Sequence, residues 1–161
     1  MRSHRNKNYT GDGKTALENF KLKRNFIIRA KHDLDLIRFI TKLAEEERIM
    51  SATFSAIGAF RSSKLGSYDQ EKHKYLEIVI DTPQEIASCI GNISLKDGKP
   101  FVHAHVVLSD ENGNTRAGHL FEGLVFAAEI HLQEFDGFKL ERKHDEVTGL
   151  SLWDMERTSS G

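Results

Sequence analysis

Two short turn signals in the middle of the chain, Asp97-Gly98 and Asn112-Gly113, constrain its fold more than any other feature. Both dipeptides favour the left-handed backbone of tight turns and are typical of hairpins between antiparallel strands. The residues between them, Pro100–Leu108, are rich in side chains that favour strands. The sequence therefore predicts an antiparallel meander with strands over roughly 86–95, 99–109 and 115–121.

One stretch before the meander has the spacing of an amphipathic helix. Its apolar stripe consists of Leu36, Ile37, Ile40, Leu43 and Ala44. This i, i+3, i+4, i+7 pattern predicts one buried helix face. Asp33 is expected to cap the helix, and Asp35 to complement the positive end of its dipole.

The rest of the chain has the short apolar runs of further strands. These are expected near 22–30, 53–57, 64–68, 75–80, 125–135 and 138–143, with a turn at residues 58–61. One helix and seven or eight strands predict an α+β fold, a compact and mostly antiparallel β-sheet domain with one main amphipathic helix.

The length of 161 residues is typical of one domain. We predict a flexible basic leader over 1–20, the folded domain over 21–155 and a disordered tail over 156–161. Residues 1–24 hold seven basic and two acidic residues, a balance of +5, which leaves −6 for the remainder of a chain of net charge −1. A basic head of this kind can contact phosphates, although a protein gripping nucleic acid over its whole surface is excluded.

Cysteine content and hydropathy indicate a cytoplasmic protein. Cys89 is the single cysteine, so no disulfide can form within the chain, and it is expected to be a buried apolar residue. The apolar runs are far shorter than the roughly 20 residues of a membrane helix. The first residues lack the apolar core of a secretory signal, so neither a membrane nor a secreted protein is expected.

Three histidines are the candidate metal ligands of this sequence. Side chains alternate along a strand, so His103 and His105 point to the same face. The Asn-Gly turn brings His119 back, in a register that places it opposite residues 105 to 107. Three converging imidazoles are the donor set of a zinc site with a fourth position open to water or an anion. Copper, nickel and iron also bind such sites, and two half-buried histidines without a metal are common.

Four other polar residues are candidates for a role in binding or catalysis. Arg61 could bind an anion, but pairing with a carboxylate is the favoured interpretation. Three glutamates are candidate general bases for a zinc-activated water: Glu85, Glu122 and Glu129. Glu129 stands out because its neighbours are apolar, and a buried carboxylate needs a partner.

Several separated blocks of the chain resemble the PPC-domain family (plants and prokaryotes conserved domain). The blocks are Ala56–Ser62, Gly66–Asp69, Gly91–Ser94, His103-Ala104-His105, Gly118-His119-Leu120 and Asp145–Trp153. The resemblance covers roughly residues 23–153 and is closest to the stand-alone archaeal and bacterial members. It implies a homotrimer and a zinc ion bound by His103, His105 and His119. It also implies a DNA-binding or regulatory-assembly role, although the chain has no AT-hook.

Three functions therefore remain open at this point. The first is a zinc-binding trimeric module that takes part in DNA association or regulatory assembly. The second is a metal-dependent enzyme, a hydrolase or lyase acting on a small substrate through the three-histidine site. The third is a protein that binds a small anionic metabolite at the metal.

Overall fold

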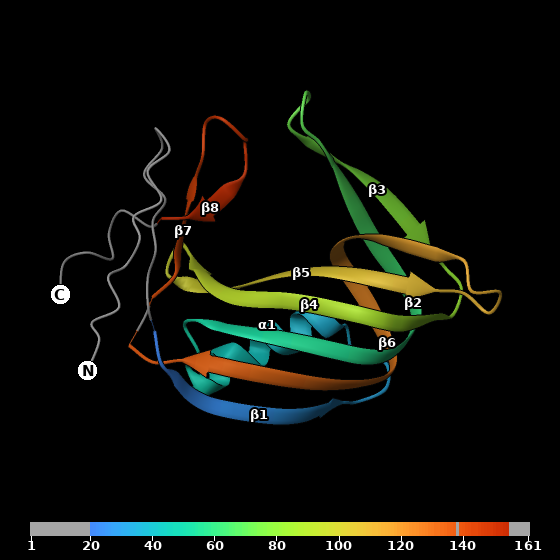
Figure 1. Ribbon diagram of the computed structural model, residues 1–161, viewed down its shortest axis with the longest axis horizontal. Helices are drawn as coiled ribbons and strands as arrows, with labels where there is room; N and C mark the ends of the chain where they lie inside the picture. The colour runs from blue at the N-terminus through green and yellow to red at the C-terminus, as the bar shows by residue number, and fades with distance from the viewer. Residues whose placement is uncertain (1–19, 138, 155–161) are drawn as a thin grey trace, which may run out of the picture.

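The structure is a computed structural model that describes residues 20–137 and 139–154, in which the chain forms one helix and eight strands (Figure 1). Their bounds are β1 Leu22–Ala30, α1 Leu36–Glu47, β2 Ala52–Asp69, β3 Lys74–Ile80, β4 Gln84–Lys96, β5 Lys99–Ser109, β6 Thr115–Phe135, β7 Glu141–His144 and β8 Ser151–Trp153. The expected class, a mostly antiparallel sheet with one helix, is confirmed. The predicted leader and tail lie outside the described residues, apart from Phe20.

The strands form one sheet that bends back on itself. Its order is β3-β2-β6-β5-β4-β7-β8, β1 adds to β6, and β2 also pairs with β4. The pairs are antiparallel except for β4 and β7. Because β2 meets both β6 and β4, the central strands close into a ring. Figure 1 shows β3 and the β7–β8 pair rising from the same side of this body, at its two ends.

Two predicted breaks in the sheet are absent. The prediction of a turn at residues 58–61 is wrong, because β2 continues through these residues. The strands predicted at 115–121 and 125–135 form one continuous strand, β6. Register shifts near Phe60 and Val125 bend the two strands without ending them. Gly58 has φ 137°, and a Cβ there would lie 2.1 Å from the Ala127 carbonyl oxygen. Glycine thus permits the close approach that keeps the long strands paired.

Both predicted hairpins form, with different turns. Asp97 and Gly98 have φ of 53° and 73°, as a two-residue turn between β4 and β5 requires. The second connection is a longer loop, because the Asp110 carboxylate accepts hydrogen bonds from the backbone of Asn112 and Asn114. The expected strand 138–143 is present as β7, displaced toward the C-terminus, and β8 was not predicted.

The helix is capped by Asp35 and not, as predicted, by Asp33. Asp35 Oδ1 accepts a hydrogen bond from the Arg38 backbone at 2.8 Å, while its Oδ2 accepts one from the Gly123 backbone at 2.7 Å. One carboxylate therefore caps α1 and ties it to β6. Asp33 instead forms a salt bridge with Arg61. The predicted apolar stripe is confirmed, and Leu36, Ile40 and Ala44 are fully buried.

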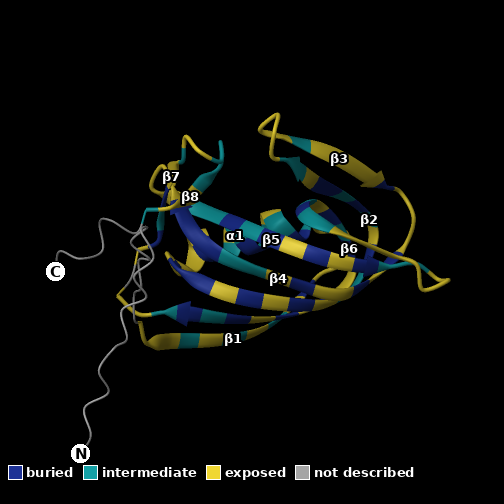
Figure 2. Cartoon of the chain, turned by 45° about the horizontal axis from the view of Figure 1, so that its top comes forward, coloured by how far each residue is buried: buried dark blue, intermediate teal, exposed yellow. Residues whose placement is uncertain are grey.

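The core lies between α1 and the concave side of the sheet. Buried and exposed residues alternate along the strands (Figure 2), so β5 buries Val102, Ala104, Val106 and Leu108 while the residues between them face the other way. His103 and His105 belong to that other face. In the described part of the chain, no helix is long and apolar enough to cross a membrane.

Candidate metal centre

The β5–β6 hairpin brings the three predicted histidines together. His105 pairs directly with His119 in the ladder, and His103 lies two residues before His105 on the same face of β5. Their ring centroids are 5.0 to 5.6 Å apart, and one nitrogen of each ring lies within 4.8 Å of the other two. Within the predicted range of residues 105 to 107, the structure places His119 opposite His105.

The electrostatics of the cluster favour neutral rings. Burial, together with the positive charge of Arg142 and of the neighbouring ring, lowers the pKa of His103 to about 4. Burial and the other two histidines lower the pKa of His119 to about 4 as well. The two rings are therefore unprotonated at neutral pH, the state in which imidazole nitrogens bind metals.

One buried nitrogen indicates that the cluster suits a metal ion. Nδ1 of His119 is buried and has no hydrogen-bond partner among the described residues. A buried polar atom without a partner costs free energy, and a cation can satisfy it. Three neutral imidazoles also form the ligand set of open zinc sites. The residues present therefore fit a Zn²⁺ ion held by His103, His105 and His119.

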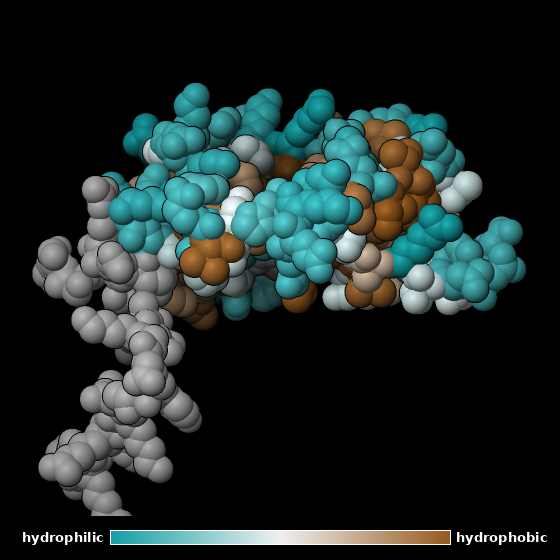
Figure 3. Space-filling view, turned by 90° about the horizontal axis from the view of Figure 1, so that it is seen from above, coloured by the Kyte–Doolittle hydropathy of each residue, from teal (hydrophilic) through white to brown (hydrophobic). Residues whose placement is uncertain are grey.

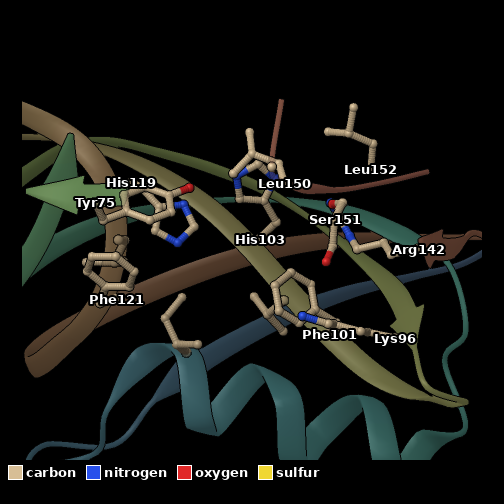
Figure 4. A pocket seen from close by; sticks show the side chains of 14 residues that line it. Tyr75, Lys96, Phe101, His103, His119, Phe121, Arg142, Leu150, Ser151 and Leu152 are labelled. Carbon is tan, nitrogen blue, oxygen red and sulfur yellow. The ribbon is translucent and has the colours of Figure 1, made fainter. Parts of the chain in front are cut away.

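Two aromatic rings pack against the His119 ring. The ring of Phe121 lies 4.8 Å from that of His119, and the ring of Tyr75, from β3, lies 5.1 Å from it. Gly66 makes room for both rings, since a Cβ there would lie 2.5 Å from Phe121 and 2.8 Å from Tyr75. Figure 4 shows these two side chains beside His119.

His103 and His119 line a cavity of about 400 Å³ between β3 and the β7–β8 region. Arg142 enters it from β7, and Leu150, Ser151 and Leu152 border it from the last described segment (Figure 4). β3 and β8, which flank the cavity, rise from the same side of the body (Figure 1). The surface seen from that side is largely hydrophilic, with apolar side chains exposed among the polar ones (Figure 3).

The other candidate residues lie away from this cavity. Arg61 pairs with Asp33, as the favoured interpretation held. Glu85, Glu122 and Glu129 are exposed and do not line the cavity, and the expectation of a buried Glu129 is wrong. Alternation explains the error, because Glu129 points outward between the buried residues Ala128 and Ile130.

Sequence reasoning did not single out Arg142, Lys96 or Tyr75, which line the same cavity. Arg142 lies in a run of charged residues that is typical of an exposed strand, so no local signal marks it as buried. Cys89 is buried as predicted, and burial raises the pKa of its thiol to about 12.

Comparisons with known proteins agree with this architecture. A metal-containing protein from Archaeoglobus fulgidus is 43% identical, with a TM-score of 0.83 over 86% of this chain and 99% of its own. A plant- and prokaryote-conserved (PPC) protein from Pyrococcus horikoshii is 42% identical, with a TM-score of 0.83 over 87% of this chain and 97% of its own. A provisionally assigned DNA-binding protein from Ralstonia eutropha is 25% identical, with a TM-score of 0.72 over 79% and 88%.

None of the curated proteins compared with the chain matches it. Residues 17–136, well over half of the sequence, match the Plants and Prokaryotes Conserved (PCC) domain. The fold, the blocks of sequence and the archaeal structures point the same way. The chain therefore belongs to the PPC-domain family.

Proposed function

We propose that this protein binds one Zn²⁺ ion per protomer through His103, His105 and His119 and acts as a homotrimeric PPC-domain module. The observation that carries the metal site is the convergence of three imidazoles, one of which has a buried nitrogen without a hydrogen-bond partner among the described residues. The metal-containing relative from Archaeoglobus fulgidus supports it. A bound Zn²⁺ supplies a positive charge with an open position, which suits the capture of an anion.

The metal site is tested by elemental analysis of untagged protein purified without chelators. We expect about one zinc per chain in the wild type and a loss of most of it in His119→Ala. His144→Ala is the matched control, because His144 is exposed on β7 and lies outside the cluster. A wild-type protein without metal that also fails to take up added Zn²⁺ contradicts the proposal.

Trimer formation is supported by apolar side chains on the outer face of the sheet. Ile27, Ile57 and Ile90, from β1, β2 and β4, are 85%, 57% and 63% exposed. Residues of these strands that alternate with them are buried in the core or packed against it, so the three isoleucines point away from α1. Exposed apolar groups of this kind mark interaction surfaces. Because the chain belongs to the PPC-domain family, we propose that the partners at this surface are further copies of the same chain.

Native mass spectrometry tests the assembly. We expect a mass three times that of the 18.3 kDa chain. The double variant Ile57→Glu, Ile90→Glu is expected to give monomers, because buried unpaired carboxylates oppose association. Val147→Glu adds one such carboxylate at a residue that is 83% exposed in the segment between β7 and β8, and is expected to remain a trimer. A monomeric wild type contradicts the assembly proposal.

DNA association is the second candidate function, favoured by the relative from Ralstonia eutropha and by the +5 balance of residues 1–24. The test is a gel shift with the full chain and with a variant lacking residues 1–20, across a salt series. Loose phosphate contact is expected to weaken steeply with salt, whereas specific binding survives physiological salt. No shift by either protein at physiological salt excludes this role.

Metal-dependent catalysis is less well supported by the geometry. A zinc-activated water generally needs a base within hydrogen-bond reach, and no carboxylate lines the cavity in the described part of the chain. The arrangement therefore favours binding over hydrolysis. Equal turnover of model esters and phosphate esters by wild type and His105→Ala supports that interpretation, and turnover that His105→Ala abolishes contradicts it.

A further inference from the structure

Arg142 is a buried cation whose hydrogen bonds all go to neutral groups. Its side chain lies beside the histidine cluster, and the residue is only 9% exposed. Nε donates to Ser94 Oγ at 2.7 Å, Nη1 to the Ser151 carbonyl at 2.8 Å and Nη2 to Asn92 Oδ1 at 2.9 Å. These bonds orient the guanidinium without neutralising it.

The guanidinium of Arg142 also packs against two aromatic rings, and only some of its N–H donors form hydrogen bonds. It lies 5.1 Å from the ring centre of Phe101 and 5.9 Å from that of Trp153. An arginine has five N–H donors in a rigid fork, and these three hydrogen bonds occupy three of them. Rings and hydrogen bonds therefore hold Arg142 in place while donors remain for a further acceptor.

No acidic residue balances this charge within the cavity. Arg142 forms no salt bridge among the described residues, and neither aspartate nor glutamate lines the cavity. Lys96 adds a second cation on the same side, 5.7 Å from the Phe101 ring. A buried charge without a counter-charge is costly, so the missing anion is expected to come from outside the chain.

The remaining walls of the cavity are mostly apolar, so they favour a ligand that has an apolar part. They consist mainly of Tyr75, Phe101, Phe121, Leu120, Leu150 and Leu152. A volume of about 400 Å³ is in the range of small-molecule sites. Figure 4 shows the histidines on one side of this space and Arg142 on the other.

We infer that the cavity binds a small organic anion whose carboxylate is held by Arg142 and whose apolar part lies against the aromatic and leucine side chains. The inference rests on the proposed metal centre, which supplies the second contact to the anion. Arg142 is the recognition residue in this arrangement because its fork matches the two oxygens of a carboxylate. The positive charge of Lys96 adds electrostatic attraction for the anion at longer range.

Isothermal titration of the zinc-loaded full chain tests this inference with three probes: benzoate, benzyl alcohol and inorganic phosphate. Benzoate is expected to bind at least tenfold more tightly than benzyl alcohol, which has the same ring without the charge. It is also expected to bind more tightly than inorganic phosphate, which has charge without an apolar part. Tighter binding of phosphate than of benzoate overturns the organic part of the inference.

The variants separate recognition from folding. Arg142→Lys keeps the charge but loses the fork, and is expected to weaken benzoate binding at least tenfold. Lys96→Gln changes an exposed side chain and is expected to weaken it a few-fold, even where Arg142→Lys fails to fold. Arg38→Gln, on the exposed side of α1 and outside this cavity, is the control and is expected to bind like wild type.

Zinc content, measured on the same samples, distinguishes the two proposals. Wild type that holds zinc but binds benzoate no better than benzyl alcohol overturns the anion inference and leaves the metal site standing. Unchanged benzoate affinity in both Arg142→Lys and Lys96→Gln also overturns it. Wild type that lacks zinc but binds benzoate in an Arg142-dependent way contradicts the metal site and supports the role of Arg142.

Discussion

His105 and His119 are directly paired residues of the β5–β6 ladder, so the hairpin itself sets the distance between two of the three candidate metal ligands. His103 joins them because it lies two residues away on the same face of β5. Such a cluster is held by backbone hydrogen bonds and not by flexible loops. It is therefore formed before any ion arrives.

Zinc binding is expected to raise the melting temperature of the protein. An ion that binds only the folded state stabilises it by RT ln(1 + [Zn]/Kd), which is about 2.7 kcal/mol at a free concentration 100 times Kd. Differential scanning calorimetry with and without a chelator measures the effect. His103→Ala is expected to abolish the shift and His144→Ala to retain it. An equal shift in all three proteins contradicts a site at this cluster.

The metal-free protein is expected to lose stability as the pH falls from about 6.5 to about 4. His103 and His119 have a pKa of about 4 when folded, against about 6.5 when unfolded. Between these values the unfolded chain binds more protons, so the free energy of unfolding decreases as the pH falls. We expect a loss of about 2 kcal/mol per ring, after allowing for screening of half-buried groups.

Urea unfolding across that pH range, with chelator present, measures this loss. The double variant His103→Gln, His119→Gln is expected to have a flatter pH profile, because glutamine does not titrate. His144→Gln controls for the loss of an exposed histidine and is expected to keep the wild-type slope. A profile that is identical in all three proteins contradicts the assignment.

Replacement of Asp35 is expected to cost more stability than replacement of Asp33. Asp35→Ala removes both the helix cap and the hydrogen bond to the Gly123 backbone, a loss of about 2 kcal/mol. Asp33→Asn removes the charge from the exposed salt bridges with Arg61 and His32 and still suits the left-handed backbone of residue 33 (φ 63°), so about 0.5 kcal/mol is expected. Chemical denaturation measures both. Equal losses contradict the assignment of Asp35 as the cap.

Gly66→Ala is expected to destabilise the fold and weaken metal binding together. The added methyl group meets the rings of Phe121 and Tyr75, which pack against His119. Overpacking of this kind costs about 1–3 kcal/mol. Thermal unfolding and a zinc-binding titration measure the two effects. Gly98→Ala is a control for the loss of a glycine, because no atom lies within 4 Å of its added methyl group. It is expected to reduce stability through backbone strain while zinc affinity stays unchanged.

Local signals were sufficient for much of the molecule. The apolar spacing of Leu36, Ile40 and Ala44 predicted the helix, and the Asp97-Gly98 turn predicted the β4–β5 hairpin. The helix and the hairpin depend on residues that are close together in the chain, so the spacing of apolar residues and the residue types of the turn predict them directly. The three histidines belong to this group, since a single hairpin brings them together.

Long-range packing decided the rest. The residues around Gly58 predict a turn, but pairing with β6 and β4 keeps β2 extended through these residues. Asp33 and Asp35 are both residue types that cap helices, and the structure distinguishes them: Asp35 accepts from the backbone N–H groups of Arg38 and Gly123, whereas Asp33 pairs with Arg61.

The amino-acid sequence alone determined the helix, the hairpins and the histidine cluster, because each depends on neighbours within one or two adjacent segments. The tertiary structure alone decided the surroundings of that cluster. Arg142 lies far along the chain from His103 and His119, and it is buried beside them only because β7 pairs with β4 and its guanidinium finds Asn92 and Ser94 there. Contacts of this kind depend on where distant strands meet, which local pattern does not encode.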